Sequence, residues 1–274
     1  LQSQESPWSQ SVHDLKFTRL AQSWDEAVPL GNGMLGALIW QKGTALRISL
    51  DRADLWDLRP VKEFEGPHFR FSWIREQVLK KDYKPVQEMA DLPYERDAAP
   101  SKIPAGALQF DISSLGEVDS VRLSLQDAVC QVRWKNGAVL DTFVHATSAS
   151  GWFRFENLPS KIVPEIAPPP YGEAVGPANS QANSVTGDDL RRLGYPAPHI
   201  VKKDGLWLYH QVGWGGFSYD VRLRWNSLPD GQLIGVWEID TSPSGKGPSS
   251  QTITKSEPTP SAWKAAIQSH LEWW

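Results

Sequence analysis

Short stretches that are apolar, or in which apolar and polar residues alternate, dominate the chain and predict β-strands. Alternation is the period of a half-buried strand, and the stretches end at glycine, asparagine or proline, which favour turns. An antiparallel meander of strands, in a sandwich or a barrel, is therefore predicted. The predicted strands span residues 15–20, 35–40, 45–50, 108–112, 121–125, 129–134, 139–146, 152–156, 205–212, 218–225 and 232–239.

Turn residues join some of these strands into hairpins. Gly43-Thr44 connects two of them, so residues 51–56 are expected at the open end of that hairpin. Asn136-Gly137 connects two others, and an Asn-Gly pair is the strongest short-range hairpin signal.

The spacing of apolar residues becomes helical at two places. Residues 71–90 hold one or two predicted short helices, and residues 259–261 (Thr-Pro-Ser) open a helix that runs to the end of the chain. Residues 164–200 are rich in proline, asparagine, serine and glycine and are predicted as a long loop or an edge insertion. Residues 241–260 have the composition of a linker.

The charge and hydropathy of the chain exclude several classes of partner. Lys and Arg total 28 against 32 for Asp and Glu, a net charge of −4. Without a basic run, the chain is not expected to bind nucleic acid or an anionic membrane surface. Its apolar stretches are far shorter than the ~20 residues that cross a bilayer, so no membrane insertion is predicted.

The sequence implies no metal and no cofactor. Its six histidines are scattered without a metal-ligand spacing, and no phosphate-binding loop or Gly-x-Ser-x-Gly nucleophile motif occurs. The single cysteine, Cys130, cannot form an internal disulfide and is interpreted as a small packing residue in a strand.

Tryptophan is the unusual component, with 14 residues alongside 21 glycines and 21 prolines. Indole rings suit the apolar faces of sugar rings, so an oligo- or polysaccharide partner is indicated. The alternative is that most of these side chains pack in the core and between strands.

The segment from Trp24 to Trp56 resembles the opening of glycoside hydrolase family 95, the α-L-fucosidase group. The shared pattern is a Trp, then Pro-Leu-Gly-Asn-Gly, then Leu-Gly-Ala, a hairpin and a Leu-Trp. Three further segments keep the order of the family: Ala-Gly-Ala-Leu at 105–108, Leu-Ser-Leu-Gln-Asp-Ala at 123–128 and His-Leu-Glu-Trp-Trp at 270–274.

This resemblance implies a mainly β fold in residues 1–250, a large antiparallel β-super-sandwich related to the N-terminal domain of family 65. Residues 251–274 are then a linker and the start of the helix that leads into an (α/α)6 barrel, which this chain lacks. In the family, hydrolysis inverts the configuration and the acid and base lie in the barrel, so no catalytic residue is expected here. Met34 replaces the family's Arg, and residues 49–52 depart from its Leu-Asn-Glu stretch, so the resemblance does not fix the sugar.

Five residues are candidates for the rim of a substrate site: Asn32, Asp51, Asp54, Trp56 and Trp214. Inverting hydrolysis needs two carboxyl groups about 6.5–9.5 Å apart. Asp51 and Asp54 could face a sugar, or could form turn contacts and surface ion pairs. Asn32, between two glycines, could donate to a sugar hydroxyl or simply turn the chain, and Trp214 could be a stacking shelf or part of a plain β-turn.

Two functions remain open from the sequence. In the first, the chain is the N-terminal accessory domain of a secreted or periplasmic glycoside hydrolase and is inactive without the missing barrel. In the second, it is a self-sufficient carbohydrate-binding module that uses exposed tryptophans and the 164–200 loop. The first predicts an apolar patch where residues 259–274 and the sandwich meet the barrel, and the second predicts an exposed aromatic groove with polar flanks.

Overall fold

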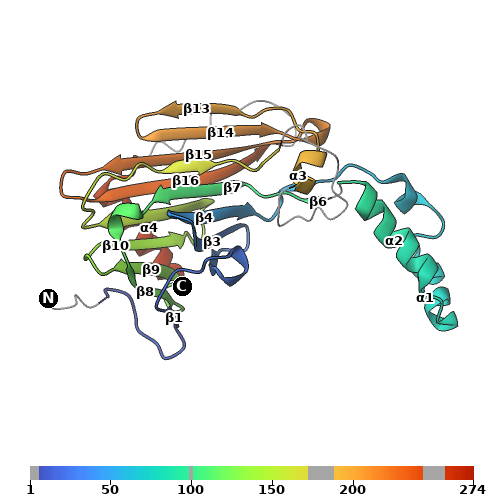
Figure 1. Cartoon of the computed structure of the whole chain (residues 1–274), viewed down its shortest axis with the longest axis horizontal. Helices are drawn as coiled ribbons and strands as arrows, with labels where there is room; N and C mark the ends of the chain where they lie inside the picture. Colours follow the sequence, from blue (N-terminus) through green and yellow to red (C-terminus); the bar gives the residue numbers. More distant parts are fainter. Residues whose placement is uncertain (1–5, 99–100, 172–187, 243–256) are drawn as a thin grey trace.

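A computed structural model describes residues 6–98, 101–171, 188–242 and 257–274, which form two facing β-sheets with helices at the periphery (Figure 1). One sheet has nine strands and the other has five, and all of their pairings are antiparallel. The predicted mainly β fold with large antiparallel sheets is confirmed.

The nine-stranded sheet runs in the spatial order β1 (Leu15–Phe17), β8 (Val118–Ser124), β9 (Val129–Trp134), β10 (Val139–Val144), β11 (Ser150–Glu156), β16 (Leu233–Ser242), β15 (Ser218–Ser227), β14 (Leu206–Val212) and β13 (His199–Lys203). The five-stranded sheet runs in the order β12 (Glu165–Ala167), β7 (Gly106–Asp111), β4 (Ala45–Arg52), β3 (Leu35–Lys42) and β2 (Val28–Gly31). A separate short pair joins β5 (Trp56–Asp57) to β6 (Ser101–Lys102).

Both predicted hairpins are confirmed. β3 and β4 pair from Lys42 and Ala45 at the turn to Leu35 and Arg52 at the open end. β9 and β10 are joined through Gly137, whose φ of 94° lies in the left-handed region that glycine adopts without strain.

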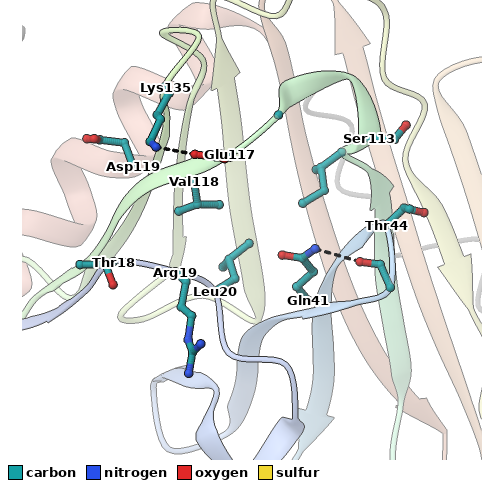
Figure 2. Close-up of a pocket in the computed structure, with 13 residues that line it drawn as sticks. Thr18, Arg19, Leu20, Gln41, Thr44, Ser113, Glu117, Val118, Asp119 and Lys135 are labelled. Atoms are coloured by element: carbon teal, nitrogen blue, oxygen red, sulfur yellow. Dashed lines mark hydrogen bonds and ion pairs between the residues drawn. The ribbon is translucent and has the colours of Figure 1, made fainter.

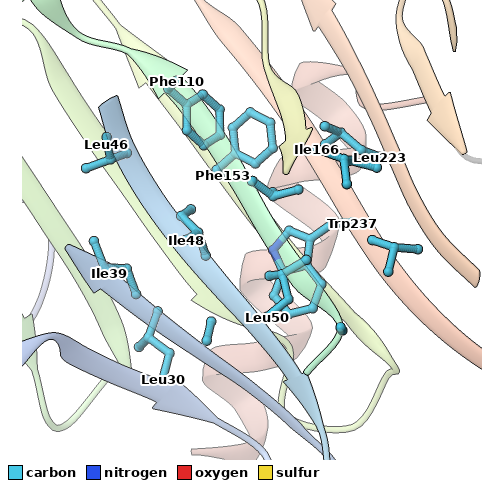
Figure 3. Close-up of a cluster of buried hydrophobic side chains, with 14 of the residues drawn as sticks. Leu30, Ile39, Leu46, Ile48, Leu50, Phe110, Phe153, Ile166, Leu223 and Trp237 are labelled. Atoms are coloured by element: carbon cyan, nitrogen blue, oxygen red, sulfur yellow. The ribbon is translucent and has the colours of Figure 1, made fainter. Parts of the chain in front are cut away.

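The core lies between the two sheets. Every second residue of β3 and β4 is buried, and these side chains meet Phe110 of β7 and Phe153 and Trp237 of the facing sheet (Figure 3). Phe110 and Phe153 meet edge to face, with ring centres 4.9 Å apart. The alternation of the sequence therefore marks the side of each strand that faces the opposite sheet.

Strands at the centre of the nine-stranded sheet are buried on both faces. All six residues of β10 are buried, because one face meets the five-stranded sheet and the outer face is covered by α4 (Pro260–Trp273). Trp263 and Ile267 of α4 pack on a patch of the outer face that includes Phe143 and Trp152. Thr259 caps the helix by accepting a hydrogen bond from the backbone N–H of Ala262, which confirms the predicted helix start.

The other helices lie at one end of the sandwich. α1 (Phe71–Lys80) and α2 (Lys84–Arg96) confirm the helices predicted in 71–90 and project away from the sheets (Figure 1). No residue of α1 is buried. None of the helices in the described part of the chain is both long and apolar enough to span a membrane.

The predicted loop at 164–200 contains regular structure at both of its ends. β12 extends the five-stranded sheet, and α3 (Asp188–Arg192) precedes β13. The sequence missed these elements because each is short and lacks a periodic pattern. The middle of this loop (172–187) and most of the predicted linker (243–256) lie outside the described residues, and the division of the chain near residue 250 stays a prediction.

Candidate functional site

The open end of the β3–β4 hairpin gathers most of the residues that the sequence singled out. Asp51 is the second-to-last residue of β4, Asp54 lies two residues beyond the end of that strand, and Trp56 begins β5. The backbone N–H of Ala53 donates to the carbonyl of Met34, which ties this segment to the turn that holds Asn32. Four of the five candidates, Asn32, Asp51, Asp54 and Trp56, thus lie on adjoining turns or on the strand ends beside them, here called the hairpin end.

Trp214 lies on a neighbouring turn of the same molecule. It follows Gly213, which packs close to the ring of Tyr195. The hydroxyl of Tyr195 donates to the carboxylate of Asp57 at 2.7 Å, next to Trp56. Trp214 is 47% exposed and Trp56 is 42% exposed. Both rings are therefore accessible, and the indole N–H of Trp56 donates to the carbonyl of Ala53 at 3.0 Å.

Asp51 forms an ion pair, one of the alternatives that the sequence left open, with a partner that the sequence did not predict. Its carboxylate accepts from the ammonium of Lys102, which also donates to the carbonyl of Arg52 at 2.8 Å. Lys102 reaches this position because β6 pairs with β5, placing it opposite Trp56. Nothing in the sequence marks that pairing, since both strands are only two residues long.

Asp54 is held by Arg52, the residue two positions before it. The guanidinium of Arg52 donates to both carboxylate oxygens, at 2.7 and 3.2 Å. Another of its nitrogens donates to the carbonyl of Ile239 in β16. Burial disfavours the charge on Asp54, but the hydrogen bonds and charge of Arg52 outweigh it and hold the pKa of Asp54 below its ordinary value. Asp54 is therefore ionised at neutral pH.

Asp57 is the buried member of this acidic segment. Its side chain is fully buried and accepts from Arg59 and from the hydroxyl of Tyr195. Burial again disfavours the charge, yet these hydrogen bonds lower the pKa of Asp57. A general acid requires a raised pKa at neutral pH, so neither Asp54 nor Asp57 has the environment of one.

Asn32 connects the two sheets. Its amide nitrogen donates to the carbonyls of His145 at 2.8 Å and Ser148 at 3.2 Å, on the turn between β10 and β11. Its oxygen accepts from the backbone N–H groups of Met34 at 3.0 Å and Leu35 at 2.8 Å. All four hydrogen-bonding positions of the amide are used, so a sugar would have to displace one of these partners. A direct sugar contact by Asn32 stays a prediction.

Asn32→Ala is expected to lower the free energy of unfolding by about 2 kcal/mol, because it removes four hydrogen bonds to the backbone of two turns, two of them part-buried. Urea denaturation of the 274-residue chain measures this loss. Asn226→Ala, at a half-buried position of β15, is the matched control and should change stability by less than about 0.5 kcal/mol. Equal stability of Asn32→Ala and the unmodified chain would show that the amide network does not hold the sheets together.

Half of the tryptophans are core residues: Trp8, Trp134, Trp152, Trp207, Trp225, Trp237 and Trp263. Five are substantially exposed: Trp24, Trp56, Trp214, Trp273 and Trp274. The last two meet edge to face at 82°, so they do not form one flat platform. The high tryptophan content is therefore in large part a packing feature.

Cys130 is fully buried in β9, which supports its interpretation as a packing residue. Burial raises the pKa of its thiol to about 12, so it is not a nucleophile at neutral pH. Within the described residues, no group of three or more His, Cys, Asp or Glu side chains could hold a metal ion.

The opposite end of the β3–β4 hairpin borders a hollow of about 580 Å³ (Figure 2). It is lined by the hairpin turn at Gly43 and Thr44 and by the exposed ion pair of Glu117 and Lys135. None of the five candidate residues lines it. The candidate site is therefore the hairpin end and not this hollow.

Residues 15–150 of the chain match the family model of the N-terminal domain of glycosyl hydrolase family 65. The match runs from β1 to the start of β11 and so contains the whole β3–β4 hairpin and its open end. It supports an N-terminal sandwich domain of the family 65 type and indicates an accessory domain of a glycoside hydrolase. No protein with a curated function matches the chain.

Proposed function

We propose that the chain is the N-terminal accessory domain of a secreted or periplasmic, inverting glycoside hydrolase of the family 95 type. The observation that carries the proposal is the match of residues 15–150 to an N-terminal domain of glycosyl hydrolases. In this proposal the sandwich supports a helical barrel that holds the catalytic acid and base. The resemblance to family 95 makes an α-L-fucoside the first substrate to assay.

The charge states at the hairpin end favour a supporting role over a catalytic one. Asp51 is paired with Lys102 and Asp54 with Arg52. The hydrogen bonds and charge of Arg52 hold the pKa of Asp54 below its ordinary value, so Asp54 is a poor proton donor. In the proposed enzyme, Asp51, Asp54 and Trp56 line the rim of the active site and contact the sugar without transferring its proton.

The second candidate function is a self-sufficient carbohydrate-binding module. The exposed rings of Trp56 and Trp214 favour it, since accessible indoles can stack on sugar faces. It differs from the first candidate in that the 274-residue chain alone would bind polysaccharide through these rings. Loss of that binding in Trp56→Ala and Trp214→Ala, but not in Trp24→Ala, would identify this function.

The accessory role predicts that activity requires more than this chain. The 274-residue chain should not hydrolyse aryl glycosides, including an α-L-fucoside, whereas the product of the extended reading frame should. Both proteins are assayed at equal molar concentration. Inversion of the anomeric configuration is tested by identifying which anomer of the sugar is released first. Turnover by the 274-residue chain itself would overturn the proposal and return attention to Asp51 and Asp54.

A further inference from the structure

A continuous series of hydrogen bonds runs from α4 to the exposed ring of Trp56, through the turn between β10 and β11. It begins at His270, whose Nδ1 accepts from the backbone N–H of Ala146 at 3.1 Å. The peptide group that carries this N–H also carries the carbonyl of His145, which accepts from the side-chain amide of Asn32 at 2.8 Å. A single peptide group of the β10–β11 turn thus joins α4 to the turn that holds Asn32.

The series continues from Asn32 to the indole of Trp56. The side-chain oxygen of Asn32 accepts from the backbone N–H of Met34 at 3.0 Å. The carbonyl of Met34 accepts from the backbone N–H of Ala53 at 2.8 Å, and the carbonyl of Ala53 accepts from the indole N–H at 3.0 Å. These five hydrogen bonds, here called the α4–Trp56 network, lead from the fully buried His270 to a side chain that is 42% exposed.

The two ends of the network differ in how they are held. α4 is packed on the sheet through Trp263 and Ile267. Trp56 lies in β5, which pairs with β6 over only two residues, and so short a pairing does not by itself fix the direction of the ring. The hydrogen bond of the indole to Ala53 therefore orients the ring. Between the two ends, the tip of the β10–β11 turn (147–149) is exposed and can open without unfolding of the sheet.

We propose that the β10–β11 turn couples α4 to Trp56 and that Asn32 is the positioning residue between them. While α4 is seated, His270 holds the turn, Asn32 keeps its partners on both sides, and the indole is held in one direction. When α4 moves away from the sheet, the turn opens and Asn32 loses its acceptors. The bonds at Met34 and Ala53 then weaken as well, because hydrogen bonds in a series polarise one another. The turn is thus an element with two states, and both ends of the network shift the equilibrium between them.

The consequence of this coupling for an enzyme rests on the proposed function. In that proposal α4 leads towards a catalytic barrel and Trp56 lines the rim of its active site. The position of α4 then controls whether a ring that can stack on a sugar is in place, which a passive support would not do. Trp214, the exposed ring on the neighbouring turn, makes no hydrogen bond to the α4–Trp56 network within the described residues and serves as an internal reference.

Hydrogen exchange of the 274-residue chain, followed by NMR, tests the coupling. In His270→Ala, the indole proton of Trp56 should exchange about threefold faster or more, because the loss of one hydrogen bond lowers the free energy of local opening. The backbone protons of Met34 and Ala53 should show the same change, and the indole proton of Trp214 should exchange at an unchanged rate. His270→Phe is a second variant that keeps a ring at this position without its nitrogens, and it should have the same effect.

Leu46→Ala is the matched control. It removes a fully buried side chain at the far end of the β3–β4 hairpin, so it lowers global stability but leaves the α4–Trp56 network intact. The indole proton of Trp56 should exchange in Leu46→Ala as it does in the unmodified chain, since local opening does not require global unfolding. Faster exchange in both His270→Ala and Leu46→Ala, or in neither, would overturn the proposal. Equal acceleration of the Trp56 and Trp214 indole protons in His270→Ala would also overturn it.

Asn32→Ala tests the place of Asn32 in the network. The indole proton of Trp56 should already exchange faster in this variant, and adding His270→Ala should increase the rate no further. A further increase would show that His270 acts on Trp56 by another route, against the role assigned to Asn32. Thermal unfolding verifies that each variant is folded before exchange is measured. None of these results bears on the accessory role, which the extended protein tests separately.

Discussion

Gly235→Ala is expected to be among the most destabilising single substitutions in the sandwich, with a loss of about 3 kcal/mol or more. A Cβ at this position would lie 2.1 Å from the ring of Phe153, a distance at which one of the two must move. Phe153 lies directly opposite Gly235 on β11, is fully buried, and packs against Phe110 of the other sheet. Because the ring of Phe153 is fully buried, it can move only by displacing other core side chains.

The same arrangement occurs two pairs further along these strands, on the same face of the sheet. Trp237 lies opposite Gly151, and a Cβ on this glycine would be 2.1 Å from the indole. Large rings on one strand thus lie across glycines on its neighbour, which fills the core without a bulge in the sheet. Gly151→Ala is expected to act in the same way, because Trp237 is only 1% exposed.

Gly36→Ala is the matched control for Gly235→Ala. Gly36 also lies within a strand, but a Cβ there meets only the Cβ of Asp51 at 3.8 Å, an ordinary contact. Urea denaturation should therefore find Gly36→Ala within about 0.5 kcal/mol of the unmodified chain. If the close contact is the cause, Phe153→Leu should cost less in the Gly235→Ala background than alone. A loss below about 1 kcal/mol for Gly235→Ala would show that the core relaxes around it.

The hairpin of β3 and β4 shows what the sequence can predict. Its alternating apolar residues, the turn at Gly43 and the position of residues 51–56 at the open end were all recoverable, because they depend on neighbours in sequence. The helices at 71–90 and at the C-terminus were recoverable for the same reason. Local patterning therefore predicted these elements, although α2 continues to Arg96, beyond the predicted helical segment.

The aromatic–glycine pairs and the ion pair of Asp51 show what the sequence alone cannot predict. Gly235 stands opposite Phe153 only because β16 returns beside β11 after more than 70 residues. Lys102 reaches Asp51 only through the two-residue pairing of β5 and β6. Asn32 was recognised as a turn residue, but its contacts with the β10–β11 turn depend on how the two sheets are stacked. Contacts between distant segments carry no periodic signal in one sequence.

The attachment of α4 to the sheet depends on His270, which is fully buried. Its Nδ1 accepts from the backbone N–H of Ala146 at 3.1 Å, and its Nε2 donates to the carbonyl of Asp127 at 2.8 Å. One neutral imidazole thus ties the helix to two hairpin turns of the nine-stranded sheet. Protonation of Nδ1 would place a donor against the N–H of Ala146 and remove that hydrogen bond.

His270→Ala is therefore expected to lower the free energy of unfolding by about 3 kcal/mol at neutral pH. It leaves two buried backbone groups unpaired and opens a cavity beside Phe143, whose ring centre lies 4.7 Å from that of His270. His13→Ala, at an exposed histidine, is the control and should be nearly neutral. Urea denaturation at about pH 7.5 measures both.

The free energy of unfolding should also decrease as the pH is lowered through the range in which histidine takes up a proton. Burial lowers the pKa of His270 below its ordinary value despite the carbonyl of Asp127, and burial lowers the pKa of His145, whose ring centre is 6.1 Å away. Below about pH 6.5 the unfolded chain takes up protons that the folded chain resists. The free energy of unfolding is therefore highest above that pH and decreases as the pH falls from about 7.5 to about 5.5.

The His270→Ala variant distinguishes the contribution of His270 from the loss of stability that other titrating groups cause at low pH. The free energy of unfolding of His270→Ala should change less between about pH 7.5 and about pH 5.5 than that of the unmodified chain, because the contribution of His270 is gone. In His13→Ala the change should be the same as in the unmodified chain. The reason is that only a histidine whose pKa differs between the folded and unfolded states contributes to the slope. An identical pH dependence in His270→Ala and the unmodified chain would mean that His270 takes up its proton in the folded chain without releasing α4.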